Sequence, residues 1–187
     1  AVLTAAAEAG PSPSTRGEIL MEVARIFEIL LEDEARAEQV YQKVIEIDRN
    51  DPQLVIPAAQ ALGRIYASKG NHAALADALN VEVKLEENVD KRRELYERIG
   101  GLYETILEDS EKAIEAWRSR LNDDPTDATA LSALERLYER TAAYRDLVGV
   151  LRAREQSTSD EKERRRTMVK AAETLADKIG DVPEAIS

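Results

Sequence analysis

The chain has 187 residues, of which 34% are charged, 43% are hydrophobic and 4% are aromatic, and its formal net charge at pH 7 is −11. A balance this negative repels a phosphate backbone, so we expect no nucleic acid partner. Cysteine is absent, which excludes a disulfide framework, a thiolate nucleophile and a cysteine-based zinc site. Apolar runs fall short of the roughly 18 residues that cross a bilayer. We therefore predict a soluble protein with no membrane partner, and we favour the cytoplasm over the periplasm.

Helical periodicity of apolar residues runs through most of the chain. Residues 1–9 lack the basic region of a secretory signal, and we predict that they end a preceding helix. After a break at 10–14, antiparallel helix pairs are predicted at 15–31 with 34–48, 53–68 with 71–86, 91–107 with 110–121, and 127–141 with 143–156. A fifth first helix is predicted at 160–178, with a partner that begins at Pro183. We expect the chain to be part of a longer array.

Helix starts are predicted from two kinds of signal. The first is the capping box, found as Thr15 with Glu18 and as Thr158 with Glu161. The second is an aspartate before a proline, whose missing N–H costs nothing in a first turn; the two examples are Asp51-Pro52 and Asp124-Pro125.

The helix pairs repeat at a nearly fixed period. Equivalent second-helix positions fall at residues 37, 75, 113, 147 and 185, which are spaced by 38, 38, 34 and 38 residues. A period in this range is typical of a stacked-repeat solenoid. We divide the chain into 1–14, a preceding helix end and connection, and five repeats at about 15–51, 52–89, 90–125, 126–158 and 159–187, the last truncated. The odd repeats carry one extra residue between their helices.

The repeats also share a short motif that begins in the first helix, although some depart from it, with Leu75 and Leu147 in place of the second-helix alanine. A small residue is followed three positions later by an aromatic residue, most clearly as Gly63 with Tyr66 and Gly100 with Tyr103. An alanine then marks the second helix, as at Ala113. The chain resembles the tetratricopeptide repeat (TPR) family over residues 15–187. The resemblance implies an all-α fold, namely a right-handed α-solenoid of antiparallel helix pairs that forms a TPR-like superhelix.

The resemblance further implies a concave binding surface on the first helices. Projecting the groove positions of the family gives these protein-binding candidates: Met21, Arg25, Gln60, Arg64, Glu97, Glu104, Arg136 and Glu173. Three of them, Arg25, Arg64 and Arg136, are predicted to form a basic line. The lysine and asparagine clamp that some TPR proteins use to hold acidic chaperone tails is absent.

Other candidate sites have simpler interpretations. His72, the one histidine, lies in a turn without a nucleophile or an orienting partner nearby in the sequence. The carboxylate-rich turns lack the calcium-loop pattern. The aromatic residues Phe27, Tyr66, Tyr103, Tyr138 and Trp117 are predicted to lie in the core. Gly100 is predicted to permit close helix packing. Two basic clusters, Lys91-Arg92-Arg93 and Lys162–Arg166, are interpreted as solvated faces, with a local patch for an acidic peptide as the alternative. We predict no catalytic residue, metal or cofactor.

These observations favour a non-enzymatic scaffold that binds a protein or peptide. The alternative is a regulatory repeat segment of a larger enzyme or signalling protein whose catalytic domain is not in this chain. An RNA-processing repeat protein is disfavoured by the charge. Because truncated arrays expose apolar edges, homo-oligomers through exposed terminal helices are also considered.

Overall fold

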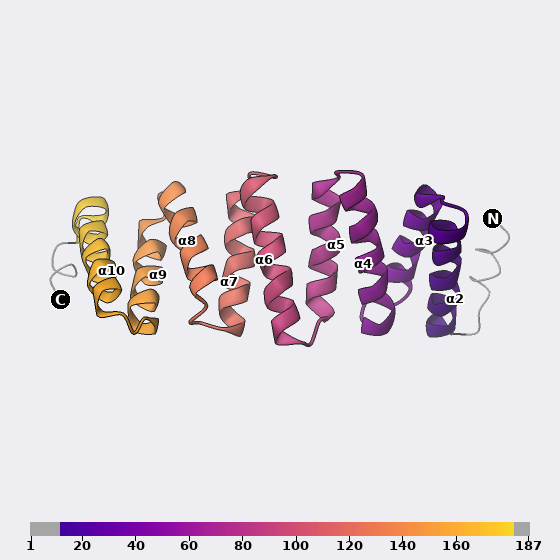
Figure 1. Cartoon of the computed structure of the whole chain (residues 1–187), viewed down its shortest axis with the longest axis horizontal. Helices are drawn as coiled ribbons and strands as arrows, with labels where there is room; N and C mark the ends of the chain where they lie inside the picture. The colour runs from indigo at the N-terminus through magenta and orange to yellow at the C-terminus, as the bar shows by residue number, and fades with distance from the viewer. Residues whose placement is uncertain (1–11, 182–187) are drawn as a thin grey trace. The chain divides into compact units, whose positions relative to one another are not determined.

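The computed structural model describes residues 12–181, and these form helices with no strand between them (Figure 1). The all-α prediction is therefore confirmed for this part of the chain. The first helix, α2, is Pro13–Arg25 and continues into a π-helical turn, η1, at Ile26–Leu30. The predicted helix at 1–9 and the second helix predicted from Pro183 lie outside the described residues.

The remaining helices follow the predicted pairs closely. Their bounds are α3 Glu34–Ile47, α4 Pro52–Ser68, α5 His72–Leu85, α6 Val89–Thr105, α7 Ser110–Asp123, α8 Ala128–Arg140, α9 Tyr144–Ser157 and α10 Glu161–Glu173, with a second π-helical turn, η2, at Thr174–Ile179.

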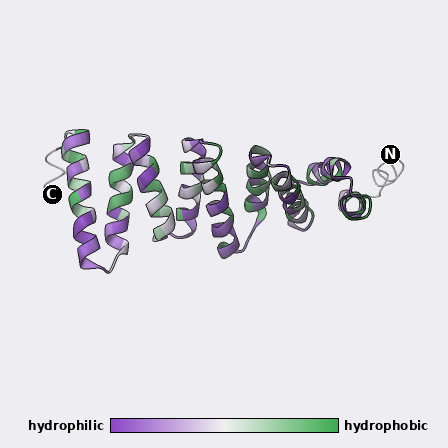
Figure 2. Ribbon diagram, turned by 45° about the horizontal axis from the view of Figure 1, so that its top comes forward, coloured by the Kyte–Doolittle hydropathy of each residue, from purple (hydrophilic) through white to green (hydrophobic). Residues whose placement is uncertain are grey.

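The chain divides into two compact units, an N-terminal unit that ends at Leu95 and a C-terminal unit that begins at Tyr96. In the N-terminal unit, α2 packs on α3, α3 on α4, and α4 on α5. In the C-terminal unit, α7 packs on α8, α8 on α9, and α9 on α10. Each helix in Figure 2 carries both apolar and polar residues, as expected for helices that bury one face against their neighbours.

The turns inside the helix pairs share one backbone conformation. One residue in each turn has a positive φ: Glu32 (51°), Gly70 (64°), Glu108 (53°), Ala142 (54°) and Gly180 (79°). The N–H of the following residue donates to the carbonyl oxygen of Phe27, Tyr66, Tyr103, Tyr138 or Leu175, at 2.8 to 2.9 Å. A left-handed residue closed by such a bond is a common helix ending. The left-handed positions have the same spacings as the sequence repeat.

The extra residue of the odd repeats widens the last turn of the first helix. Both described π-helical turns, Ile26–Leu30 and Thr174–Ile179, end first helices of odd repeats. In the third repeat the N–H of Leu107 bonds to the carbonyl oxygen of Leu102 at 3.0 Å, across the same wider ring. The extra residue thus changes only the last turn of the first helix. The carbonyl oxygens of Phe27, Tyr103 and Leu175 still accept the N–H of the residue after the left-handed position.

Several predicted helix caps are wrong, although each of these helices begins within two residues of its predicted start. Ser12, not Thr15, caps α2, because Pro13 with its fixed φ suits the first helical position. Asp160, not Thr158, caps α10. Asp51 caps α4 before Pro52 as predicted. Asp124 instead ends α7 and accepts hydrogen bonds from the N–H and hydroxyl of Thr126 at 2.9 and 2.7 Å, so α8 begins only after Asp127.

The aromatic residues of the first helices lie in the core, as predicted. Phe27, Tyr66, Tyr103 and Tyr138 are buried, and so is Trp117 on α7. The Gly100 prediction is also confirmed, because a Cβ atom there would lie 2.6 Å from Cε2 and Nε1 of the Trp117 ring. The close approach of α6 and α7 therefore depends on glycine at position 100, which has no side chain.

Candidate functional site

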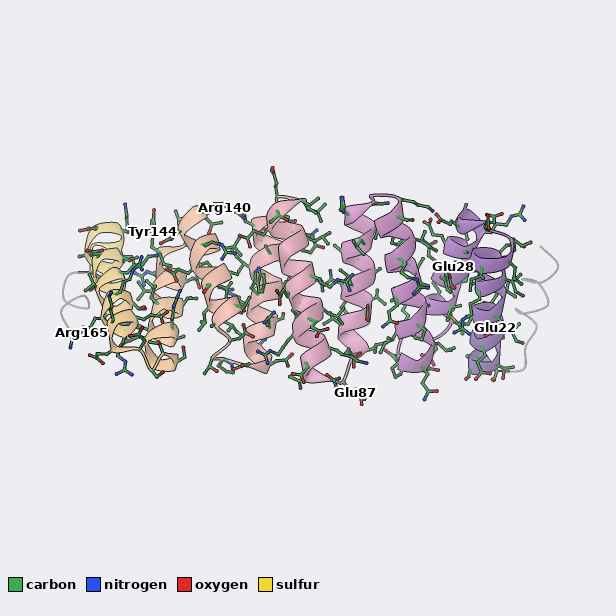
Figure 3. All side chains as sticks on the ribbon, in the orientation of Figure 1. Glu22, Glu28, Glu87, Arg140, Tyr144 and Arg165 are labelled. Carbon is green, nitrogen blue, oxygen red and sulfur yellow. The ribbon has the colours of Figure 1, made fainter. Side chains whose placement is uncertain are left out.

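The arginines of the predicted basic line already have carboxylate partners in the chain. The ion pairs are Arg25 with Glu22 at 2.8 Å, Arg64 with Glu28 at 3.3 Å, and Arg136 with Glu104 at 3.3 Å. Glu22 and Glu28 are labelled on the first helix pair in Figure 3. Because these pairs are exposed on the arginine side, each contributes little stability, on the order of 0–1 kcal/mol. They do, however, neutralise the line as a site for an anion.

The other predicted groove residues have mixed surroundings. Met21 is buried at 7% exposure and belongs to the core. Gln60 donates from Nε2 to Oε1 of the buried Glu82 at 2.7 Å, so its amide is already engaged. Glu173 is exposed. The prediction from the first helices therefore mixes core, paired and open positions.

Glu97 takes part in a charge network around the buried Arg120, although the Glu97 side chain itself is 55% exposed. The Arg120 side chain, 8% exposed, donates from Nη1 to Glu97 at 2.5 Å and from Nε to Asp127 at 3.0 Å. Its guanidinium also lies 5.8 Å from the Trp117 ring centroid. The pair of Arg120 with Asp127, which is 2% exposed, is buried, and removing one partner of a buried pair is strongly destabilising. Glu97 adds a half-exposed contact from α6 to this pair, so its carboxylate is already engaged within the chain.

Arg154 repeats this arrangement one repeat later, between α8, α9 and α10. Its guanidinium pairs with Glu135 and Glu163, each at 2.8 Å, and Lys170 pairs with Glu135 and Glu139, each at 2.5 Å. Burial by itself raises the pKa of Glu135, but the hydrogen bonds and charges of Lys170 and Arg154 outweigh it and lower that pKa overall. The Lys170 pKa is raised, because its two carboxylate hydrogen bonds outweigh the burial that lowers it. Both shifts favour the charged forms of Glu135 and Lys170.

A pocket of about 370 Å³ lies beside this network. We call it the α10 pocket, and it is lined by Glu135, Leu151, Arg154, Asp160, Lys162, Glu163, Arg166, Thr167 and Lys170. Four lining residues are cationic and three are carboxylates. Asp160 is occupied as the cap of α10, where it accepts the N–H of Lys162 at 2.9 Å.

Two cations of the α10 pocket are unmatched. Within residues 12–181, the side chains of Lys162 and Arg166 form no ion pair, and they lie four residues apart on one face of α10. Their neighbours Arg164 and Arg165 instead pair with Glu161, at 3.5 and 3.1 Å. Figure 3 places Arg165 on the outer side of α10, and Figure 2 shows the strongly polar first turns of that helix. The cluster is thus divided between two faces.

The other basic cluster ends a helix. Arg92 donates from Nη1 to the carbonyl oxygens of Glu86 and Glu87, at 3.2 and 3.0 Å. Lys91 lies 3.9 Å from the Glu86 carboxylate. A cation beside the free carbonyls at a helix C-terminus is favourable, so this cluster supports the end of α5 as the solvated interpretation suggested.

His72 is the first residue of α5, and its Nδ1 atom is buried without a hydrogen-bond partner. Among the described residues, no three or more His, Asp or Glu side chains gather in a way that could hold a metal ion. In the same part of the chain, every helix is too short or too polar to cross a membrane.

No family model and no curated protein matches the chain. Solved structures that are similar to it include MamA (18% identity, 84% of this chain and 85% of that one, TM-score 0.45) and YrrB, described as a TPR protein with an unusual peptide-binding site (16%, 90% and 89%, TM-score 0.44). A third is the nearly identical TPR-like repeats of a kinesin light chain from Podosopora anserina (16%, 95% and 92%, TM-score 0.45). The descriptions of two of these structures name TPR or TPR-like repeats, the family that the sequence resembles.

Proposed function

We propose that this chain is a non-enzymatic repeat scaffold that binds an acidic segment of another protein at the α10 pocket. The observation that carries the proposal is the pair of unmatched cations, Lys162 and Arg166, on the wall of a pocket whose other cations are paired. The basic line on the first helices is a weaker candidate, because its arginines already have partners.

The surroundings of the two cations favour a carboxylate ligand. Glu135 and Glu163 are engaged by Arg154 and Lys170, so neither is free to compete for a new cation. Side chains four residues apart on a helix lie about 5–6 Å from each other at Cβ, a spacing that one carboxylate can bridge. The arginine guanidinium can donate two parallel hydrogen bonds to one carboxylate. The pocket would thus bind an aspartate or glutamate side chain of an extended peptide.

The size of the pocket limits what enters it. A volume of about 370 Å³ lies near the lower end of the range of small-molecule sites. It accommodates one or two side chains and not a folded domain. We therefore propose that the pocket anchors one acidic residue while the rest of the segment lies on the surrounding surface.

The test uses fluorescence anisotropy with a dye-labelled octapeptide, Gly-Ser-Glu-Glu-Asp-Glu-Ser-Gly, and its Gln and Asn counterpart. We expect the acidic peptide to bind and the Lys162→Ala/Arg166→Ala variant to weaken binding at least about tenfold, equivalent to about 1.4 kcal/mol. Arg165→Ala is the matched control, because it removes a cation from the same helix outside the pocket; we expect at most about a twofold change, since exposed pairs contribute little.

Two results would count against the proposal. One is equal binding of the acidic and amide peptides, or binding of neither. The other is an equal loss in the double variant and the control, which would indicate a general charge effect. Circular dichroism of each variant shows whether the helices are retained. Glu97 variants are unsuitable here, because they also remove a partner of the buried Arg120.

A further inference from the structure

The end of η1 and the turn that joins it to α3 carry exposed apolar residues. Ile29, Leu30 and Leu31 are 67%, 73% and 57% exposed, and the chain continues directly into the exposed Glu32 and Glu34. We call residues 29–34 the tip. Neither of these two glutamates forms an ion pair among the described residues. The tip is therefore an exposed apolar surface with two unpaired glutamates next to it.

The turn geometry does not require apolar residues there. In the second and fourth repeats a residue of the same left-handed conformation follows Ser68-Lys69 and Arg140-Thr141. The third repeat, which shares the extra residue, has Ile106-Leu107 in the same place, but there only Ile106 is exposed and Leu107 is half-buried. Figure 3 labels Arg140 at its turn. The tip differs from these turns because three adjacent apolar residues are exposed together, which indicates a surface that another molecule covers.

A groove of matching character lies elsewhere on the same N-terminal unit. The α3–α5 groove, of about 640 Å³, is lined by Gln42, Ile45, Glu46, Arg49, Asn50, Val81, Lys84 and Leu85. Its apolar residues are Ile45, Val81 and Leu85. Within residues 12–181, neither Arg49 nor Lys84 forms an ion pair. The groove thus offers apolar residues and two unpaired cations, against one lining carboxylate, Glu46, so its local charge and its apolar character complement the tip.

The tip cannot enter the groove of its own chain. The tip lies at the start of α3 and the groove at the C-terminal ends of α3 and α5, which are opposite ends of the helices in Figure 1. The 14 residues of α3 span about 20 Å at 1.5 Å per residue. A tip that occupies the groove must therefore come from another molecule.

We infer that the α3–α5 groove binds the tip of a second copy of this chain. The three apolar tip residues pack on the groove floor, and Glu32 and Glu34 pair with Arg49 and Lys84. Because tip and groove are different surfaces, the contact is heterologous, and each added copy leaves one tip and one groove open. A six-residue tip buries less than the roughly 1,000 Å² of a stable interface, so the association is weak and depends on concentration.

Trans-complementation with two variants tests this inference. The tip variant, Leu30→Ser/Leu31→Ser, keeps an intact groove, and the groove variant, Arg49→Glu/Lys84→Glu, keeps an intact tip. In sedimentation velocity over a range of concentrations, we expect the unmodified chain to self-associate and each variant alone to lose that association. An equimolar mixture is expected to form a one-to-one dimer and nothing larger, because only one compatible tip and groove remain.

Ile19→Ser is the control, because it removes another exposed apolar residue of the N-terminal unit (39% exposed) outside tip and groove; it should associate like the unmodified chain. The altered side chains are at the surface, and circular dichroism checks that the helices persist. A monomeric unmodified chain at all concentrations would overturn the inference. So would variants that associate normally, or a mixture that remains monomeric.

Discussion

At the residue scale, the N-cap residues that precede the second helices α3, α5, α7 and α9 differ in how well they cap. Asp33, Asn71 and Asp109 each accept the N–H three residues later, at 3.0 to 3.2 Å. Ala143 occupies the same position before α9, with φ −81° and ψ 63° close to those of Asn71, but it has no side-chain acceptor. One helix therefore begins with an uncapped N–H.

Ala143→Asn is accordingly expected to stabilise the chain by about 1 kcal/mol, because it supplies the missing acceptor. The free energy of unfolding from chemical denaturation measures the change. Asn71→Ala, the reverse change at the equivalent position, should lose a similar amount. No gain in Ala143→Asn together with a clear loss in Asn71→Ala would show that the two turns are not equivalent.

At the element scale, the two central glycines of the first helices differ in what they face. A Cβ atom on Gly63 would lie 3.6 Å from Leu75 Cδ1, an ordinary contact, whereas one on Gly100 would lie 2.6 Å from the rigid, buried Trp117 ring. We expect Gly63→Ala to be neutral or to stabilise by up to about 1 kcal/mol through helix propensity. Gly100→Ala should destabilise by about 1–3 kcal/mol through overpacking.

Denaturation of both variants measures this contrast directly, and Gly100→Ala/Trp117→Leu adds a check. The smaller leucine should remove most of the extra cost of the alanine at position 100. Equal responses of the two glycines would mean that α6 and α7 do not approach as closely as described.

The helices themselves could be predicted from sequence, because apolar spacing records which face each one buries. Most bounds are within two residues of the prediction. The capping residues of α2, α8 and α10 differ from the predicted ones, because several Ser, Thr and Asp residues near each start offer a cap and only the local backbone selects one. The π-helical turns follow from the extra residue of the odd repeats, although sequence alone did not reveal where the insertion would be absorbed.

The site was harder to predict than the fold. A groove position read from one helix does not reveal a partner on another helix, as with Arg64 and Glu28, which are 36 residues apart. The sequence shows the basic cluster at the start of α10 but not how its side chains divide between two faces. Lys162 and Arg166 line a pocket, while Arg164 and Arg165 pair with Glu161. Pairing depends on side-chain direction, which the sequence pattern does not give.

At the scale of the whole molecule, a chain with net charge −11 must bind an acidic partner against its own field. Charges separated by more than about 8 Å are largely screened at physiological ionic strength. Distant carboxylates therefore matter less than the cations in contact with the ligand. The proposed binding thus depends on the local excess of Lys162 and Arg166 and not on the overall charge.

The most direct test of this claim is a nuclear magnetic resonance titration of the isotope-labelled chain with the acidic octapeptide at physiological salt. The account predicts saturable shifts of backbone amide signals that cluster in the residues lining the α10 pocket, and their loss in Lys162→Ala/Arg166→Ala. Shifts that gather instead around Arg25, Arg64 and Arg136, or no saturable shifts at all, would contradict it.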